Sequence, residues 1–310
     1  MPLDPLAKRF LVMMAAAAPG ERSQSTADSR RRAFAKFMQF AQPDVTAVNG
    51  VDGVLPGPGG DIPYRLYAPA EPRGRLPGFV FFHGGGMVAG SIDTHDRVCA
   101  ALAQTTGCRL VSVGYRLAPE HKFPAAVEDA IAATRWVFGH ASPLGIDPTK
   151  IVVGGDSAGA TLGAVVCQDA ARNAGPPILL QCLICPVLDF EEASPSRQAF
   201  VQNYLIDKAT LDADLADYLP EGANPADPRI SPLRSTNLAG LPAAIIHTAE
   251  FDPMRDEGNA YARKLIAAGV AVDHVCHEGM IHNFHAMGAI LPQAQSVLRQ
   301  IGEQVRSVVG

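Results

Sequence analysis

The sequence lacks the features that mark membrane-spanning, nucleic-acid-binding and disordered proteins. No run reaches about 18 consecutive apolar residues, so no transmembrane helix is expected. The 26 lysines and arginines are outnumbered by 31 aspartates and glutamates, so a dedicated nucleic-acid binder is not expected. Charged residues make up 18% of the 310 residues and hydrophobic ones 47%, which excludes disorder. A chain of this length can bury ~75% of its unfolded surface without a disulfide or metal staple.

The six cysteines are also few, and they form no complete metal-binding pattern. Cys182 and Cys185 form a CxxC, which could indicate redox or zinc chemistry. The apolar run 178–186 instead predicts a buried strand, on which side chains three positions apart point to opposite faces. Because no second CxxC completes a zinc set, we expect structural thiols and no metal.

The N-terminus admits two interpretations. Lys8 and Arg9 precede the apolar stretch 10–18, as in a short signal peptide. However, the apolar residues recur at helical spacing, and Asp4 lies on the opposite, charged face. The acidic Asp4 is also atypical of the positively charged N-terminal region of a signal peptide. We therefore expect a retained amphipathic helix and a cytoplasmic protein.

Short apolar runs alternate with helical patterns beyond residue 76. Such runs are typical of parallel strands covered on both faces. The predicted strands are 78–82, 109–115, 150–154, 178–185, 243–249 and 270–276. The predicted helices are 123–138, 158–173, 255–268 and 293–308. Alternating strands and helices predict an α/β fold with a mostly parallel central sheet.

The remaining segments predict a helical cap. A second helix is expected over 25–40, with Ser25 as its N-cap, followed by a linker over 42–60. Alternating apolar residues predict a further strand at Ile62, Tyr64 and Leu66. The polar segment 189–240 is too long for a simple loop.

We expect 189–240 to fold over the carboxyl edge of the sheet, where open α/β sheets bind ligands. Residues 1–45 and 189–240 would then form the cap. The catalytic α/β domain would comprise 46–188 and 241–310.

A GxSxG pattern follows the third predicted strand and opens a helix. Its residues are Gly155, Ser157 and Gly159. This context is the one that a nucleophile elbow requires, because bulky side chains beside the serine would clash in so sharp a turn. The alternative is a glycine-rich turn that binds phosphate or only packs.

A second glycine-rich segment, residues 83–86 (the Gly loop), follows the first predicted strand. Its sequence, His-Gly-Gly-Gly, lets backbone N–H groups approach a ligand closely. Acyl transfer needs such donors for the oxyanion of its tetrahedral intermediate. His83 is interpreted as a structural residue that holds this loop.

A serine nucleophile needs a base and an orienting acid, in the order Ser, acid, His for this fold class. Asp252 comes soonest after strand 243–249, whereas Glu250, Asp256 and Glu257 suit structural roles or the dipole of the next helix. His282 occupies the loop after the last predicted strand. We therefore expect Asp252 as acid and His282 as base.

Four clustered histidines also suggest a metal site. They are His274, His277, His282 and His285. No HExxH motif is present, and a strand end and a loop do not define a ligand geometry. We interpret His274, His277 and His285 as surface or packed histidines.

Taken together, these residues resemble the bacterial hormone-sensitive-lipase-like carboxylesterases, which are α/β-hydrolases with a helical cap. The resemblance spans nearly the whole chain. It rests on MPLDP at 1–5, HGGG at 83–86, SxDxHD at 91–96, YRLAPEH at 115–121, GDSAG at 155–159, DPMRDE at 252–257 and HNF at 282–284.

The resemblance implies a cofactor-free hydrolase of short- to medium-chain esters. It implies Ser157 as nucleophile, Asp252 as acid and His282 as base. It also implies oxyanion donors from the backbone of Gly85, Gly86 and Ala158. Two departures, Met87 for an aromatic residue and Asn283 for glycine, put substrate preference in doubt, not the chemistry.

Alternatives stay open at this point. An amidase, peptidase or deacetylase could use the same triad. A non-catalytic small-molecule receptor on the same fold would lack the base, which His282 supplies here. The expected partner is a small ester substrate, with no nucleic acid or membrane span. The sequence leaves the oligomeric state open, with a homodimer as one alternative.

Overall fold

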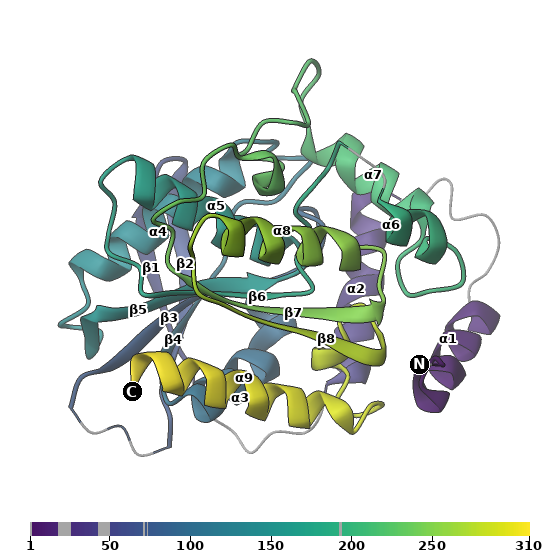
Figure 1. The fold of residues 1–310 in the computed structure, drawn as a ribbon, viewed down its shortest axis with the longest axis horizontal. Coiled ribbons are helices and arrows are strands. Elements are labelled where there is room, and N and C mark those ends of the chain that lie inside the picture. Colours follow the sequence, from purple (N-terminus) through teal and green to yellow (C-terminus); the bar gives the residue numbers. More distant parts are fainter. Residues whose placement is uncertain (1, 18–25, 43–49, 71, 73, 192–193) are drawn as a thin grey trace.

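The computed structural model describes residues 2–17, 26–42, 50–70, 72, 74–191 and 194–310. Its centre is an eight-stranded sheet in the order β1-β2-β4-β3-β5-β6-β7-β8 (Figure 1). The strands are β1 (Val51–Gly57), β2 (Gly60–Tyr67), β3 (Leu76–Phe82), β4 (Arg109–Val113), β5 (Ile146–Asp156), β6 (Leu180–Ile184), β7 (Ala243–Phe251) and β8 (Val272–Ile281). β2 runs antiparallel to both of its neighbours, β1 and β4, and all the other pairs are parallel. The predicted α/β fold with a mostly parallel sheet is confirmed.

The central strands are buried on both faces, as their continuous apolar runs predict. Every residue of β6 and the last six residues of β5 are buried. In the register of β3 with β5, Phe82 lies opposite Gly155. The Gly loop and the GxSxG turn, which follow these two positions, therefore emerge side by side at the carboxyl edge of the sheet.

Helices cover both faces of the sheet (Figure 1). α3 (Asp96–Thr106) and α9 (Gln293–Val309) lie on one face, and α4 (Ala125–Gly139), α5 (Ala158–Arg172) and α8 (Arg255–Ala267) lie on the other. α9 is strongly amphipathic. Its buried stripe includes Val297, Leu298, Ile301, Val305 and Val309. None of the described helices combines the length and apolar character needed to cross a membrane.

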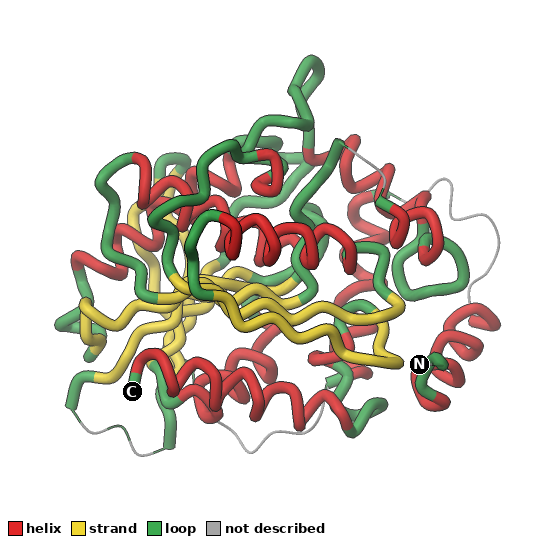
Figure 2. Tube along the Cα trace, viewed as in Figure 1, coloured by secondary structure: helices red, strands yellow, loops and turns green. Residues whose placement is uncertain are grey.

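The four helices of the segments expected to form the cap gather around the carboxyl ends of β7 and β8 (Figures 1 and 2). They are α1 (Pro5–Ala17), α2 (Ala27–Ala41), α6 (Pro195–Phe200) and α7 (Lys208–Tyr218). Ala7, Phe10 and Leu11 bury one face of α1 in the core, as its spacing predicts. The N–H of Asp4 also donates to the carbonyl of Gly279 at 3.0 Å, which ties the start of the chain to β8.

Three sequence expectations were wrong or incomplete. β1 lies within the predicted linker 42–60. Its glycines and Pro56 disfavour strand formation, but an edge strand needs only one neighbour and tolerates them. α3 was not predicted, although its buried residues keep helical spacing. The N-cap of α2 is Thr26, whose side chain accepts from the N–H of Ser29, and Ser25 lies outside the described residues.

Candidate active site

Ser157 occupies the sharp turn between β5 and α5. Its backbone has φ 52° and ψ −119°, a conformation that non-glycine residues rarely adopt and that is typical of functional sites. A Cβ atom at Gly155 or at Gly159 would overlap the carbonyl oxygen of Phe82. The two glycines therefore let the turn pack against the end of β3, as the GxSxG pattern predicts.

A chain of hydrogen bonds joins Ser157, His282 and Asp252. His282 Nε2 lies 3.0 Å from Ser157 Oγ, and His282 Nδ1 lies 2.8 Å from Asp252 Oδ2. The three residues are 6%, 1% and 0% exposed. Asp252 directly follows β7 and His282 directly follows β8, because both strands run further than predicted. The structure thus brings the three predicted side chains together in a site with little access to water.

The other three acid candidates have different contacts. Glu250 accepts from the N–H of Gly279 at 2.7 Å. Asp256 accepts from the backbone at the start of α6, and Glu257 accepts from two N–H groups that follow β6. Of the four carboxylates, Asp252 is the one that contacts His282. The other three connect segments of the fold.

The Gly loop lies beside Ser157 and opens toward the same cleft. Gly85 has φ 128° and Gly86 has φ 66°, values that suit glycine. Within the described part of the chain, neither of these two N–H groups donates a hydrogen bond to an acceptor. Ala158 is the first residue of α5, so its N–H is one of the donors that a helix leaves free. All three predicted oxyanion residues line the cleft together with Ser157 and His282.

Asp156, which the sequence did not single out, fixes the Gly loop to the elbow. It is fully buried, and its Oδ1 accepts from the N–H of Gly84 at 3.0 Å. Its Oδ2 lies 3.3 Å from His95 Nε2 and 3.7 Å from His285 Nε2. Burial would raise the pKa of Asp156, but the two histidines outweigh it and hold that pKa well below its usual range. An ionised carboxylate therefore lies directly behind the candidate nucleophile.

His83 has the structural position that the sequence suggested. Its Nδ1 lies 2.9 Å from the carbonyl oxygen of Gly84, and its ring stacks on Tyr115 with 4.4 Å between centroids. Burial lowers the pKa of His83 to about 3, with a smaller contribution from His95. The ring is therefore neutral and buried at neutral pH, and its contacts hold the Gly loop.

The clustered histidines do not converge on one point. His277 Nε2 lies 2.8 Å from His247 Nδ1, and His274 Nε2 lies 3.2 Å from Thr248 Oγ1. His285 is fully buried and contacts Asp156. Their contacts are those of packed histidines.

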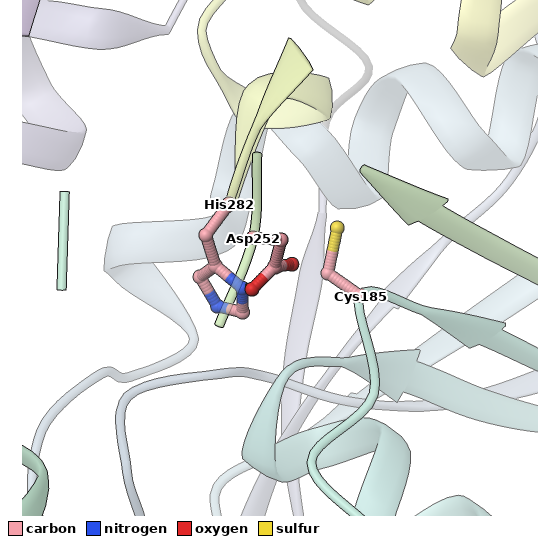
Figure 3. A group of neighbouring side chains, drawn as sticks. All are labelled: Cys185, Asp252 and His282. Atoms are coloured by element: carbon pink, nitrogen blue, oxygen red, sulfur yellow. The ribbon is translucent and has the colours of Figure 1, made fainter. Parts of the chain in front are cut away.

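The described residues contain one group of neighbouring potential metal ligands: Cys185, Asp252 and His282 (Figure 3). Their ligand atoms lie within 4.8 Å of one another, and in Figure 3 the carboxylate lies between the imidazole and the thiol. A cysteine ligand must lose its proton. Burial, reinforced by the charge of Asp252, raises the pKa of Cys185 well above its usual value. The thiol therefore suits a protonated neighbour of Asp252 better than a metal ligand.

Sequence reasoning missed this place for Cys185. The residue was expected within a strand, but β6 ends at Ile184 and Cys185 follows with φ 46°. The signal that could have located it is its position at the carboxyl end of a central strand. The candidate catalytic residues follow other strands at that same edge.

The cleft around Ser157 has a volume of about 1590 Å³, which exceeds the ~300–1,000 Å³ of ordinary small-molecule pockets. Residues of α1, α2 and the segment 197–215 line it. Among the larger apolar side chains of these segments, Phe34, Phe37, Tyr204 and Leu205 line it. Met38 is instead buried in the core, and Phe200 packs against Tyr204 and Phe251.

The two departures from the family pattern lie in different environments. Asn283 lines the cleft and has φ 59°, a left-handed conformation that asparagine tolerates better than most residues. Met87 is 1% exposed and packs in the core. Of the two, Asn283 is therefore the one positioned to contact a substrate.

Comparison with known proteins identifies the family. A family model described as alpha/beta hydrolase fold matches residues 79–286. Carboxylic ester hydrolase LipN of Mycobacterium tuberculosis is 46% identical over 243 residues, which cover 76% of this chain and 64% of LipN. Carboxylesterase NlhH of the same species is 41% identical over 249 residues, which cover 79% of this chain and 76% of NlhH.

Among solved structures, an ester hydrolase from the metagenome of Lake Arreo, complexed with a bipyridine phosphonate derivative, is 38% identical. It superposes with a TM-score of 0.95 and covers 98% of both chains. The chain therefore belongs to the α/β-hydrolase family, among the ester hydrolases that resemble hormone-sensitive lipase.

Proposed function

We propose that this chain is a serine carboxylesterase that uses Ser157 as nucleophile, His282 as base and Asp252 as acid. The observation that carries the proposal is the buried hydrogen-bond chain from Asp252 through His282 to Ser157. With Asp252 ionised, Nδ1 of His282 carries the proton and Nε2 accepts from the serine hydroxyl. His282 would therefore be ready to take the proton as Ser157 attacks.

The attack of Ser157 Oγ on the ester carbonyl would form a tetrahedral intermediate with a negatively charged oxygen. The N–H groups of Gly85, Gly86 and Ala158 would stabilise this oxyanion, since all three residues line the cleft beside Ser157. Protonated His282 would give its proton to the leaving alcohol, which leaves an acyl-enzyme on Ser157. Water activated by His282 would then release the acid. No cofactor enters these steps.

The cleft supports small esters with short to medium acyl chains as the substrates. Its walls combine apolar side chains such as Leu11 and Phe37 with the reacting residues. Residues 1–45 and 189–240 would act as the cap over a catalytic domain of 46–188 and 241–310. The cytoplasmic location and the homodimer suggested by the sequence stay predictions, which fractionation and light scattering would check.

A panel of p-nitrophenyl esters and matched anilides of graded acyl length tests the proposal. We expect turnover of short and medium esters, much slower turnover of anilides, and a loss of about 10⁶ in kcat for Ser157→Ala. Thermal unfolding should show that this variant keeps its fold. Comparable ester turnover by folded Ser157→Ala would overturn the proposal. Anilides hydrolysed as fast as esters would indicate an amidase.

A further inference from the structure

The carboxylate of Asp214, on α7, lies against the Gly loop. A Cβ atom on Gly86 would overlap Asp214 Oδ2, so the two residues are in contact. Asp214 lines the cleft together with Ser157 and His282, and its side chain is 19% exposed. A carboxylate therefore lies next to the backbone that would hold the carbonyl oxygen of an ester.

Arg30, on α2, only partly neutralises this carboxylate. Its guanidinium donates to Asp214 Oδ1 at 2.8 Å and also pairs with Asp217 on α7. One cation thus faces two carboxylates. In the described part of the chain, no side chain donates to Asp214 Oδ2. That oxygen is therefore available to a ligand in the cleft.

Other groups of the cleft suit a positively charged ligand. Phe34, Phe37 and Tyr204 line it, and aromatic faces attract cations. The remaining charged residues that line it are Lys8 on α1, Arg197 on α6, and Asp207 and Asp212 on or beside α7. Arg197 pairs with Glu257, and Asp212 pairs with Lys208.

We propose that Asp214 is a specificity-determining residue that favours esters carrying an ammonium group over neutral esters of the same shape. The inference rests on the proposed function, because that function places the reacting carbonyl beside Gly86. Arg30 keeps the carboxylate in position through Oδ1. Oδ2 supplies the negative charge that the ammonium group approaches.

The selectivity should depend on pH in a defined direction. Burial raises the pKa of Asp214 to about 7, and Asp217 adds to this effect while Arg30 opposes it. Below that pH the carboxyl is neutral and the preference for a cation disappears. Above it the carboxylate is ionised and the preference is full.

The test compares kcat/KM for choline acetate with that for its neutral isostere, in which a tert-butyl group replaces the trimethylammonium group. A second pair carries the same replacement on the acyl side, in ethyl esters of trimethylammoniobutanoate and its isostere. Because both members of a pair react at the same triad, pH effects on the shared chemical step cancel in the ratio. In the wild-type enzyme, we expect the ratio for at least one pair to rise about tenfold from about pH 5.5 to about pH 8.5.

Two variants localise the effect. Asp214→Asn is isosteric and should remove the rise, leaving a ratio about tenfold lower at the alkaline end. Asp217→Asn is the matched control, because Asp217 also pairs with Arg30 but does not line the cleft. It should keep the rise and move its midpoint to lower pH, since Asp217 helps to raise the pKa of Asp214.

A ratio of the two kcat/KM values that does not change with pH, for both pairs in the wild-type enzyme, would overturn the inference. This part of the test uses the wild-type enzyme alone and so does not depend on the folding of a variant. An unchanged rise in Asp214→Asn would overturn it as well. If Ser157→Ala is inactive, either of these two results leaves the proposed function intact and overturns only the role of Asp214. An active Ser157→Ala variant would instead overturn the proposed function, while the ratio could still be measured.

Discussion

Asp156 and Asp214 are both largely buried carboxylates that touch the Gly loop, but their pKa values shift in opposite directions. Asp156 contacts Gly84 from the elbow side, and its pKa lies well below the usual range despite burial. Asp214 contacts Gly86 from α7, and burial raises its pKa to about 7. The two sides of one loop thus meet carboxylates of different charge at neutral pH.

The difference comes from the partners of each group. Asp156 has a backbone N–H and two imidazoles, which come from separate segments at the sheet edge. Asp214 shares one guanidinium with Asp217. The carboxylate at the sheet edge therefore has several fixed partners, whereas the carboxylate on α7 has a pKa of about 7, so its charge changes with pH near neutrality.

The sheet edge and α7 also differ in how tightly their residues are packed. Every residue of β6 is buried. The structure describes all of α7, and Tyr218 is its one fully buried residue, whereas Asp214 stays partly exposed. Changes at the sheet edge should therefore alter the chemical step. Changes in the cap should alter the choice of substrate.

The largest effect within this comparison is expected for Asp252→Asn. Loss of the carboxylate should leave His282 in the wrong tautomer and lower kcat by about 10⁴. Asp256→Asn is the matched control, because Asp256 lies four residues away and bonds to the start of α6 instead. It should lose far less activity. Equal losses in the two variants, measured with a neutral p-nitrophenyl ester, would show that the acid is wrongly assigned.

A smaller effect is expected for Asp156→Asn. The isosteric amide keeps the volume but loses the ionised acceptor for the N–H of Gly84, so the Gly loop should lose its fixed position. Misplaced oxyanion donors should lower kcat by about 10² and change KM little, because they act on the transition state. A variant whose KM rises while kcat stays at the wild-type value would contradict this role.

The smallest effect is expected on the cap side. Phe37 lines the cleft, whereas Phe40 on the same helix is 60% exposed and does not. Phe37→Ala should enlarge the cleft and shift the acyl-length optimum of kcat/KM to longer chains, since each accommodated methylene contributes ~0.8 kcal/mol. Phe40→Ala should keep the wild-type optimum. If both variants keep it, α2 does not form part of the acyl site.

The sequence predicted the sheet edge well because each candidate residue there follows a strand. Ser157, Asp252 and His282 come directly after β5, β7 and β8, and parallel strands deliver such residues to one edge. Local rules of strand, turn and helix therefore placed the three candidate residues at one edge of the sheet without knowledge of distant contacts.

The same rules could not predict the contacts between α2 and α7. Arg30 and Asp214 are 184 positions apart, and α7 has no apolar stripe that would orient it. Cys185 also escaped notice, because its place beside Asp252 depends on the residue at which β6 ends. Such contacts depend on how separate segments pack, which local spacing does not encode.

The most direct test of the central claim is covalent trapping of the nucleophile. A p-nitrophenyl phosphonate ester mimics the tetrahedral intermediate and should release one equivalent of nitrophenol per chain. Mass spectrometry of the digested enzyme should then find the phosphonyl adduct on Ser157, and Ser157→Ala should release no burst. A stoichiometric adduct on any other residue, or full inactivation of the enzyme with Ser157 unmodified, would contradict the account.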